Sequence, residues 1–419
     1  MILPDNGKVA VFDDKITEIQ GFLKTLSKNR IPYLYYQDEL GGDLPTEPIK
    51  NIRLVILDLE LVTDNLSPSN IVSAIGSRLK KVLAPNTAYF LIYWSEKEEE
   101  YRKYFEATFE NGLKDYKPLL MKSMNKIEAL KSDDPVDYIQ NNLLKEFGEI
   151  SSMHSFLLWE SCVNNASGSL TNHLTGIFKK DSYWDKNFKN LLYTLSKSKV
   201  GKDLVNDLND KNRLTSAFEF INTTLVETIE SEYNNRINEI EITGIDQGGS
   251  GINEEEKIKL NTSFHLIKAP DLQHFISGNI YFKDIDTRGE EMLKFNFKEA
   301  QLSEIKKKDP KLVCLDITPT CDYSQRKNFT RVLFGISVDK LFRNEIKNGE
   351  SKYKNCPVFD IGVQNILLFD YRHFTTYTKD EFENEFKQKP SFRIRNSLLL
   401  DIQAHVSNHI NRPGVVTIE

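Results

Sequence analysis

The chain has 419 residues, with 55 basic and 61 acidic side chains and a formal net charge of −6. This length allows two or three domains, and the apolar fraction of 39% supports folded cores rather than disorder. The mildly acidic balance disfavours nucleic acid as a non-specific partner, because such binders usually carry a basic excess. The four scattered cysteines predict neither a disulfide framework nor a zinc site, and they suit a reducing cytoplasm. From the sequence pattern we expect neither a membrane-spanning stretch nor a signal peptide.

Strands and amphipathic helices alternate through the first third of the chain. The predicted strands cover residues 8–12, 32–36, 52–59, 87–94 and 117–121. The predicted helices between them cover residues 15–30, 69–83 and 98–111. Apolar runs separated in this way are typical of buried parallel strands. Because right-handed crossovers place helices on both faces of such a sheet, we expect a doubly wound five-stranded parallel sheet.

Polar residues end four of these apolar runs. They are Asp13 and Asp14, then Asp58, then Ser95, then Lys122. The carboxyl ends of the strands form the ligand crevice of an open parallel sheet, so we expect these five side chains to meet there. Mg²⁺ prefers hard oxygen ligands, and an ammonium group can neutralise charge on a transferring phosphoryl group. The pattern therefore predicts a site for a divalent cation and a phosphoryl group.

These five residues, in this strand order, resemble the receiver domain of bacterial response regulators over roughly residues 1–126. The resemblance implies the flavodoxin-like α/β receiver fold. It implies that Asp58 accepts a phosphoryl group from a histidine kinase or phosphotransfer protein. It also implies that Asp13, Asp14 and Asp58 hold Mg²⁺, that Lys122 stabilises the phosphoryl group and that Ser95 reports its presence.

The chain departs from the receiver pattern in three ways. Lys122 is followed by Ser123 where the family usually has Pro, the connection before Ser95 is long, and Trp94 is bulky for its position. Lys117 is an alternative for the lysine role, but it precedes the fifth apolar run whereas Lys122 follows it. These departures suit a phosphate buffer or docking protein, which needs less switching than a regulator does.

The middle of the chain, residues 131–243, has helical periodicity only. We interpret it as a helical connector or a dimerisation region, so a homodimer is one expected state of the protein. Residues 244–256 contain four glycines among polar neighbours. No Lys-Ser or Lys-Thr pair follows them, so a linker or hairpin loop is favoured over a nucleotide-binding loop.

The last part, residues 244–419, is interpreted as a β-rich α+β domain with a closing helix over residues 398–412. Its predicted strands are rich in β-branched and aromatic residues and cover residues 277–282, 311–318, 331–338, 357–361 and 365–378.

One segment of the C-terminal part, residues 316–327, leaves a chemical alternative open. Cys321 lies where a predicted strand passes into a loop, with Asp322 beside it, and could act as a nucleophile or a metal ligand. His265, His274 and His373 are candidate partners that the sequence cannot place. The other interpretation is that Cys321 is a small buried residue and Asp322 caps the loop.

Three functions follow from these patterns. In the first, the protein is a phosphate acceptor rather than a turnover enzyme. Its chain would then comprise a receiver-like domain (1–130), a helical region (131–243) and a C-terminal domain (244–419). By architecture alone, this arrangement also resembles the receiver partners of two-component-like phage-defence systems of the Detocs kind. The second is a pseudo-receiver that binds partners without phosphorylation. The third is an enzyme centred on Cys321.

Overall fold

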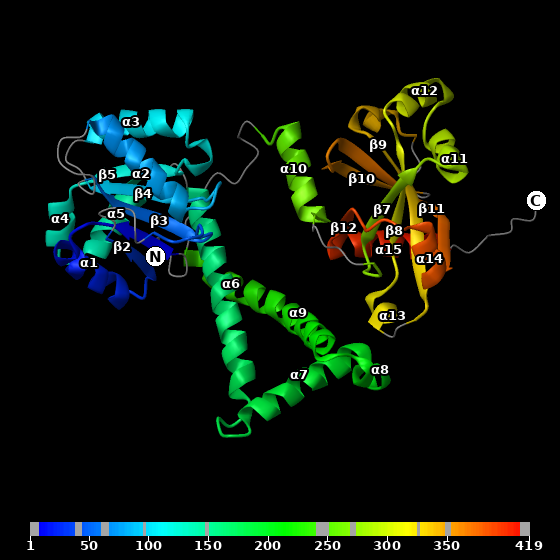
Figure 1. The fold of residues 1–419 in the computed structure, drawn as a ribbon, viewed down its shortest axis with the longest axis horizontal. Helices are drawn as coiled ribbons and strands as arrows, with labels where there is room; N and C mark the ends of the chain where they lie inside the picture. Colours follow the sequence, from blue (N-terminus) through cyan, green and yellow to red (C-terminus); the bar gives the residue numbers. More distant parts are fainter. Residues whose placement is uncertain are drawn as a thin grey trace, which may run out of the picture. The chain divides into compact units, whose positions relative to one another are not determined.

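The computed structural model describes residues 8–37, 44–59, 67–94, 98–146, 151–239, 251–268, 274–324, 327–347 and 353–410. The chain divides into two compact units (Figure 1). The first combines Met1–Trp184 with Ile221–Ile245, and the second combines Asp185–Phe220 with Asp246–Glu419. In the described part of the chain, every helix falls short of the length or the apolar character that crossing a membrane requires.

The first unit contains an α/β sheet followed by helices. Its elements are β1 (Lys8–Phe12), α1 (Ile16–Lys28), β2 (Tyr33–Tyr36), β3 (Ile52–Asp58), α2 (Pro68–Val82), β4 (Phe90–Trp94), α3 (Glu98–Asn111), β5 (Leu120–Met124), α4 (Lys126–Lys131), α5 (Pro135–Glu146), α6 (Ser151–Gly176) and the later part of α9 (Asp210–Arg236).

All pairings in this first sheet are parallel, and the strand order is β2-β1-β3-β4-β5. One face of the sheet packs against apolar residues of α1, α4 and α5, and the other face packs against α2 and α3 (Figure 1). Each strand sends alternate side chains into the two cores, which explains its nearly continuous apolar sequence. This strand order is that of flavodoxin-like doubly wound proteins. The predicted fold class is confirmed.

The fifth strand begins later than the sequence pattern predicts. The expected strand covers residues 117–121, whereas β5 covers Leu120–Met124. A short 3₁₀ turn, Lys114–Tyr116, precedes it, and Pro118 has no backbone N–H to donate to a strand ladder. The Leu119 N–H donates the first hydrogen bond to the neighbouring segment, to the Tyr89 carbonyl at 2.9 Å. The carboxyl end of β5 is therefore three residues further along the chain, which matters for the site.

The second unit is built around an antiparallel sheet. Its elements are α7 (Trp184–Val200), α8 (Lys202–Asp207), the start of α9, α10 (Glu254–His265), β6 (Leu266–Ile267), β7 (Asn279–Asp284), α11 (Thr287–Asn296), α12 (Glu299–Lys307), β8 (Lys311–Asp316), α13 (Thr320–Ser324), β9 (Phe329–Asp339), β10 (Tyr353–Asp360), β11 (Gln364–Thr378), α14 (Lys379–Glu385), β12 (Phe392–Ile394) and α15 (Asn396–Ile410).

The seven strands of this sheet lie in the order β10-β11-β9-β8-β7-β12-β6. Apolar residues of α10, α11, α12 and α14 cover one face, and those of α15 cover the other. The predicted β-rich domain with a closing helix is confirmed. Residues 244–250 of the predicted linker lie outside the described residues. Helix α10 begins directly after Asn253, whose side chain forms a capping box with Glu256.

Candidate functional site

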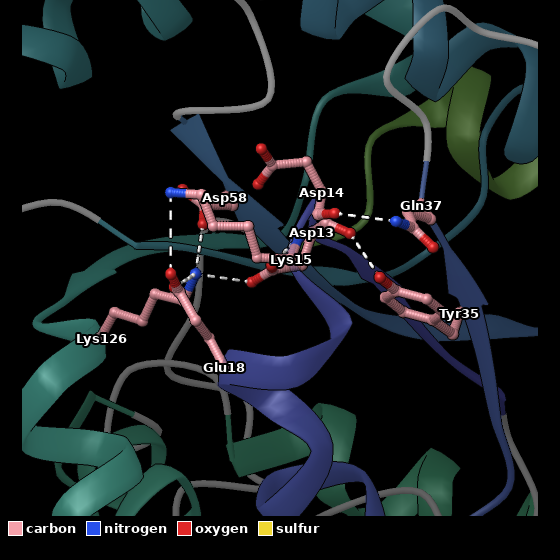
Figure 2. A network of polar contacts seen from close by, with 8 residues as sticks. All are labelled: Asp13, Asp14, Lys15, Glu18, Tyr35, Gln37, Asp58 and Lys126. Atoms are coloured by element: carbon pink, nitrogen blue, oxygen red, sulfur yellow. Dashed lines mark hydrogen bonds and ion pairs between the residues drawn. The ribbon is translucent and has the colours of Figure 1, made fainter.

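Three carboxyl groups meet at the carboxyl ends of β1 and β3, which are neighbours in the first sheet. Asp13 and Asp14 follow β1 directly, and Asp58 is the last residue of β3. One oxygen of each residue lies within 4.8 Å of the others, and Asp13 and Asp58 are buried. Figure 2 shows the three side chains around one point at this edge of the sheet. The structure thus brings together the three acids that the strand ends predict.

The donor set of this acidic cluster fits a hard divalent cation. Mg²⁺ takes carboxylate and water oxygens in an octahedron. Asp14 Oδ1 is buried and accepts no hydrogen bond from the described residues. A buried polar atom without a partner is costly, so a ligand for this oxygen would offset that cost. Asp13, Asp14 and Asp58 are therefore the residues that would hold Mg²⁺.

A lysine side chain reaches the same point from the opposite side of the cluster (Figure 2). The Nζ of Lys126 lies 2.5 Å from Asp58 Oδ2, 2.8 Å from Asp13 Oδ2 and 3.0 Å from Glu18 Oε2. Lys126 is the first residue of α4, and the side chain of Asn125 caps this helix by accepting from the N–H groups of its first turn. The cap fixes the start of α4 just after β5, and this places the ammonium at the acidic cluster.

The charges of the cluster depend on one another. Burial raises the pKa of Asp13, although the hydrogen bond from Lys126 opposes this effect. Burial lowers the pKa of Lys126, but its hydrogen bonds to Asp13 and Asp58 outweigh burial, so the pKa is raised overall. Lys126 is therefore fully charged at neutral pH and is held by carboxylates, as expected for a buried ammonium.

Tyr35 of β2, Gln37 just after β2 and Lys15 just before α1 hydrogen-bond to the two adjacent acids (Figure 2). The Tyr35 hydroxyl donates to the Asp13 carbonyl at 2.7 Å, and Gln37 Nε2 donates to the Asp14 carbonyl at 3.0 Å. The Lys15 N–H donates to Asp13 Oδ1 at 2.9 Å. Burial, and then the nearby carboxylates, raise the pKa of Tyr35 to about 12, so its hydroxyl stays a donor. The first two bonds hold the backbone of both acids, and the third orients the carboxyl group of Asp13.

The other predicted site residues lie as follows. Ser95 lies outside the described residues. Lys122 is in the middle of β5, opposite Ile92 of β4, rather than after the strand. Lys117 forms an exposed ion pair with Glu110 at 2.6 Å, outside the acidic cluster. The predicted role of Lys122 stays a prediction from sequence, whereas the ammonium observed on Asp58 is that of Lys126.

The strand-end pattern of the sequence does not predict Lys126 as a site residue. The pattern takes the apolar run at residues 117–121 as the strand, so the next lysine, Lys122, is chosen as the strand-end residue. The strand continues through Met124, and the residue that leaves it with an ammonium group is Lys126. The absence of proline after Lys122 is the signal that could have directed attention to the second lysine.

The acidic residues near Cys321 have structural roles. The side chain of Cys321 itself lies outside the described residues. Asp322 is buried and forms ion pairs with Lys327 at 2.7 Å and Arg331 at 3.5 Å. Asp316 accepts hydrogen bonds from the Tyr323 hydroxyl and the Thr318 N–H. The two acids thus anchor the turn that contains α13.

Two of the three candidate histidine partners of Cys321 lie against aromatic rings. His274 stacks on Tyr281 with ring centres 5.7 Å apart. His265 lies edge-on to Phe359 at 6.3 Å. His373 is on β11 in a stretch where the register shifts, and burial lowers its pKa. These contacts give the rings of His265 and His274 ordinary packing roles.

Asp316 should make the stability of the protein depend on pH. Burial raises the pKa of its carboxyl group from 3.8 to about 6. The folded protein then holds this proton more tightly than the unfolded chain does, so this contribution to stability is lost as pH rises towards about 6. Asp316→Asn does not titrate. Its free energy of unfolding relative to wild type should rise by up to about 3 kcal/mol between about pH 4 and pH 7.

Urea unfolding of both proteins across this pH range measures the difference. The comparison between the two proteins cancels the titration of all other carboxyl groups. A difference that stays constant with pH would show that Asp316 titrates normally.

The strand order of the first sheet and the acids at its carboxyl edge define a receiver-like α/β segment. No family model and no curated protein matches the chain. Among solved structures, full-length FixJ from B. japonicum aligns with 56% of this chain and 99% of its own length, at 8% identity and a TM-score of 0.20. A TM-score this low carries no weight, so the receiver-like character rests on the topology and the site.

Proposed function

We propose that the first unit is a phosphate-accepting receiver domain, with Asp58 as the residue that is phosphorylated. One observation carries this proposal: the buried Asp58 carboxylate lies beside Asp13 and Asp14 with a lysine ammonium 2.5 Å away. This arrangement of groups can bind a cation and a phosphoryl group at the same carboxylate. A purely structural sheet end gains little from bringing three carboxyl groups together, two of them buried, because like charges repel.

The transfer needs only a positioned nucleophile and charge neutralisation. A carboxylate oxygen of Asp58 attacks phosphorus, a P–O bond forms, and the bond to the donor breaks. The electron pair of that bond stays on the leaving nitrogen of a phosphohistidine, or on the leaving oxygen of acetyl phosphate. Mg²⁺ held by Asp13, Asp14 and Asp58 would neutralise negative charge on the phosphoryl oxygens.

We assign to Lys126 the role that the receiver resemblance gives to the lysine after the fifth strand. Its ammonium already contacts Asp58, so a phosphoryl oxygen on that residue would lie within its reach. Ser95 follows β4 directly and is proposed to donate a hydrogen bond to the phosphoryl group. The buried Asp13 holds Lys126 in place from the other side.

The donor that we propose is a histidine kinase or a phosphotransfer protein of a two-component-like phosphorelay. The further setting we propose, by architecture, is anti-phage defence of the Detocs kind. There, the chain would buffer or relay phosphate.

The direct test is phosphorylation in solution. Wild-type protein incubated with acetyl phosphate and Mg²⁺ should gain the mass of one phosphoryl group, and Asp58→Asn should gain none. Trp94 pairs with Asp58 across β3 and β4 and is buried, so beryllofluoride binding should also change its fluorescence in wild type alone. Asp137→Asn, an exposed change on α5, is the matched control and should behave as wild type.

A wild-type protein that shows neither a mass gain nor a fluorescence change would exclude phosphate acceptance at this site. Function in cells that persists with Asp58→Asn would then favour the pseudo-receiver interpretation. Circular dichroism of each variant checks that the fold is retained, so that a loss of phosphorylation is not a loss of structure.

A further inference from the structure

Glu18 is a fourth carboxyl group at the phosphate-accepting site, and the strand-end pattern does not account for it. It lies in the first turn of α1 and points toward the acidic cluster (Figure 2). Its Oε2 is 3.0 Å from the Nζ of Lys126, and its Oε1 is 3.6 Å from the Nζ of Lys15. The side chain is 46% exposed, whereas that of Asp58 is 4% exposed. Glu18 is thus the solvent-facing member of the cluster.

The ammonium of Lys126 has three N–H donors, and three carboxyl groups lie within hydrogen-bond distance of it. Glu18 and Asp58 each accept a hydrogen bond from Lys126, and Asp13 forms an ion pair with it at 2.8 Å. The hydrogen bond from Lys126 lowers the pKa of Glu18, so Glu18 is ionised at neutral pH. The charge of Lys126 is therefore divided between the acceptor Asp58 and a carboxylate that has no part in holding the cation.

We propose that Glu18 is a positioning residue that acts through Lys126 and weakens the hold of the site on the phosphoryl group. This inference rests on the proposed phosphorylation of Asp58. A phosphoryl group brings negative charge and oxygens that compete for the same ammonium. Glu18 opposes this in two ways, because it occupies one N–H donor and because its own charge repels the phosphoryl oxygens.

Glu18 should strengthen the binding of the cation, whereas it weakens the binding of the phosphoryl group. Its negative charge attracts Mg²⁺ to the cluster, and its hydrogen bond takes up part of the Lys126 charge that competes with the cation for Asp13 and Asp58. Loss of the Glu18 charge should therefore weaken Mg²⁺ binding while it strengthens phosphoryl binding. A role in folding alone would change both affinities in the same direction or neither.

Glu18→Gln tests the proposal with the full chain. Mg²⁺ alone, titrated by Trp94 fluorescence, should bind about threefold more weakly, and beryllofluoride at saturating Mg²⁺ should bind about threefold more tightly. Phosphorylated protein should also lose its phosphate more slowly than wild type. Because Glu18 is partly exposed, these differences should shrink as the salt concentration rises.

Glu128→Gln is the matched control. Glu128 is an exposed residue on α4, two positions from Lys126, and it contacts the Tyr138 hydroxyl at 3.3 Å rather than the cluster. It should leave both affinities unchanged. Equal or weaker beryllofluoride binding by Glu18→Gln, with normal uptake by wild type, would overturn the inference and leave the proposed function standing. A wild type that binds no beryllofluoride and takes up no phosphate would overturn both.

Discussion

Lys126→Met should reduce the rate of phosphoryl uptake from acetyl phosphate by about a hundredfold, and Lys122→Met should leave it within about threefold of wild type. Lys126 contacts Asp58 directly, whereas Lys122 lies in the middle of β5. Methionine keeps most of the length of the lysine side chain and removes only the charge. Comparing the two variants therefore separates the effect of the Lys126 charge, which lies at the site, from that of the nearby Lys122 charge within the strand.

Lys126→Met should also change how Mg²⁺ affects the stability of the protein. Without the ammonium, Asp13 and Asp58 lose their shared buried counter-charge, which costs about 3 kcal/mol of folding free energy. A cation can replace that charge. We therefore expect Mg²⁺ to raise the unfolding temperature of Lys126→Met more than that of wild type.

Rate measurements by intact mass, and thermal unfolding with and without Mg²⁺, check both expectations. If Lys122→Met lost phosphoryl uptake while Lys126→Met kept it, the lysine role would return to Lys122. If both variants took up phosphate normally, the ammonium at Asp58 would have a structural role only.

The first sheet could be predicted because its signals are local. Each strand carries a continuous apolar run, each run ends at a polar residue, and parallel connectivity brings those ends to one edge. The three acids followed from this logic, since Asp13, Asp14 and Asp58 each lie directly at a strand end. The boundary of β5 could not be predicted in this way, because Pro118 and the turn before it shift the start of the strand without breaking the apolar pattern.

Contacts that depend on side-chain reach were not predictable from strand ends. Glu18 is in the first turn of α1 and Lys126 is the first residue of α4, yet their side chains meet at 3.0 Å. In the second unit, the strong strands such as β9 and β11 were predicted from their composition. The short β6 and β12 were not, because β12 is three residues long and its pairing with β7 joins segments far apart in the sequence.

Gly335→Ala should destabilise the second unit by about 3 kcal/mol. Gly335 lies in β9, between Val313 of β8 and Phe369 of β11, just where the register of β11 shifts. A Cβ atom at this position would overlap the Leu368 carbonyl oxygen and lie 3.0 Å from the Phe369 Cα. These are backbone atoms in a ladder, so no side-chain rotation relieves the overlap, and the strands must move apart.

Gly21→Ala is the matched control for this change. Gly21 is in the helical interior of α1, and a Cβ there meets nothing within 4 Å. Alanine is the better helix former by about 1 kcal/mol, so this variant should be slightly more stable than wild type. Urea unfolding compares the two variants. If Gly335→Ala unfolded at the same urea concentration as wild type, β9 and β11 could not approach as closely as the structure places them. If it unfolds earlier, glycine is required at this position because the neighbouring strand leaves no room for a side chain.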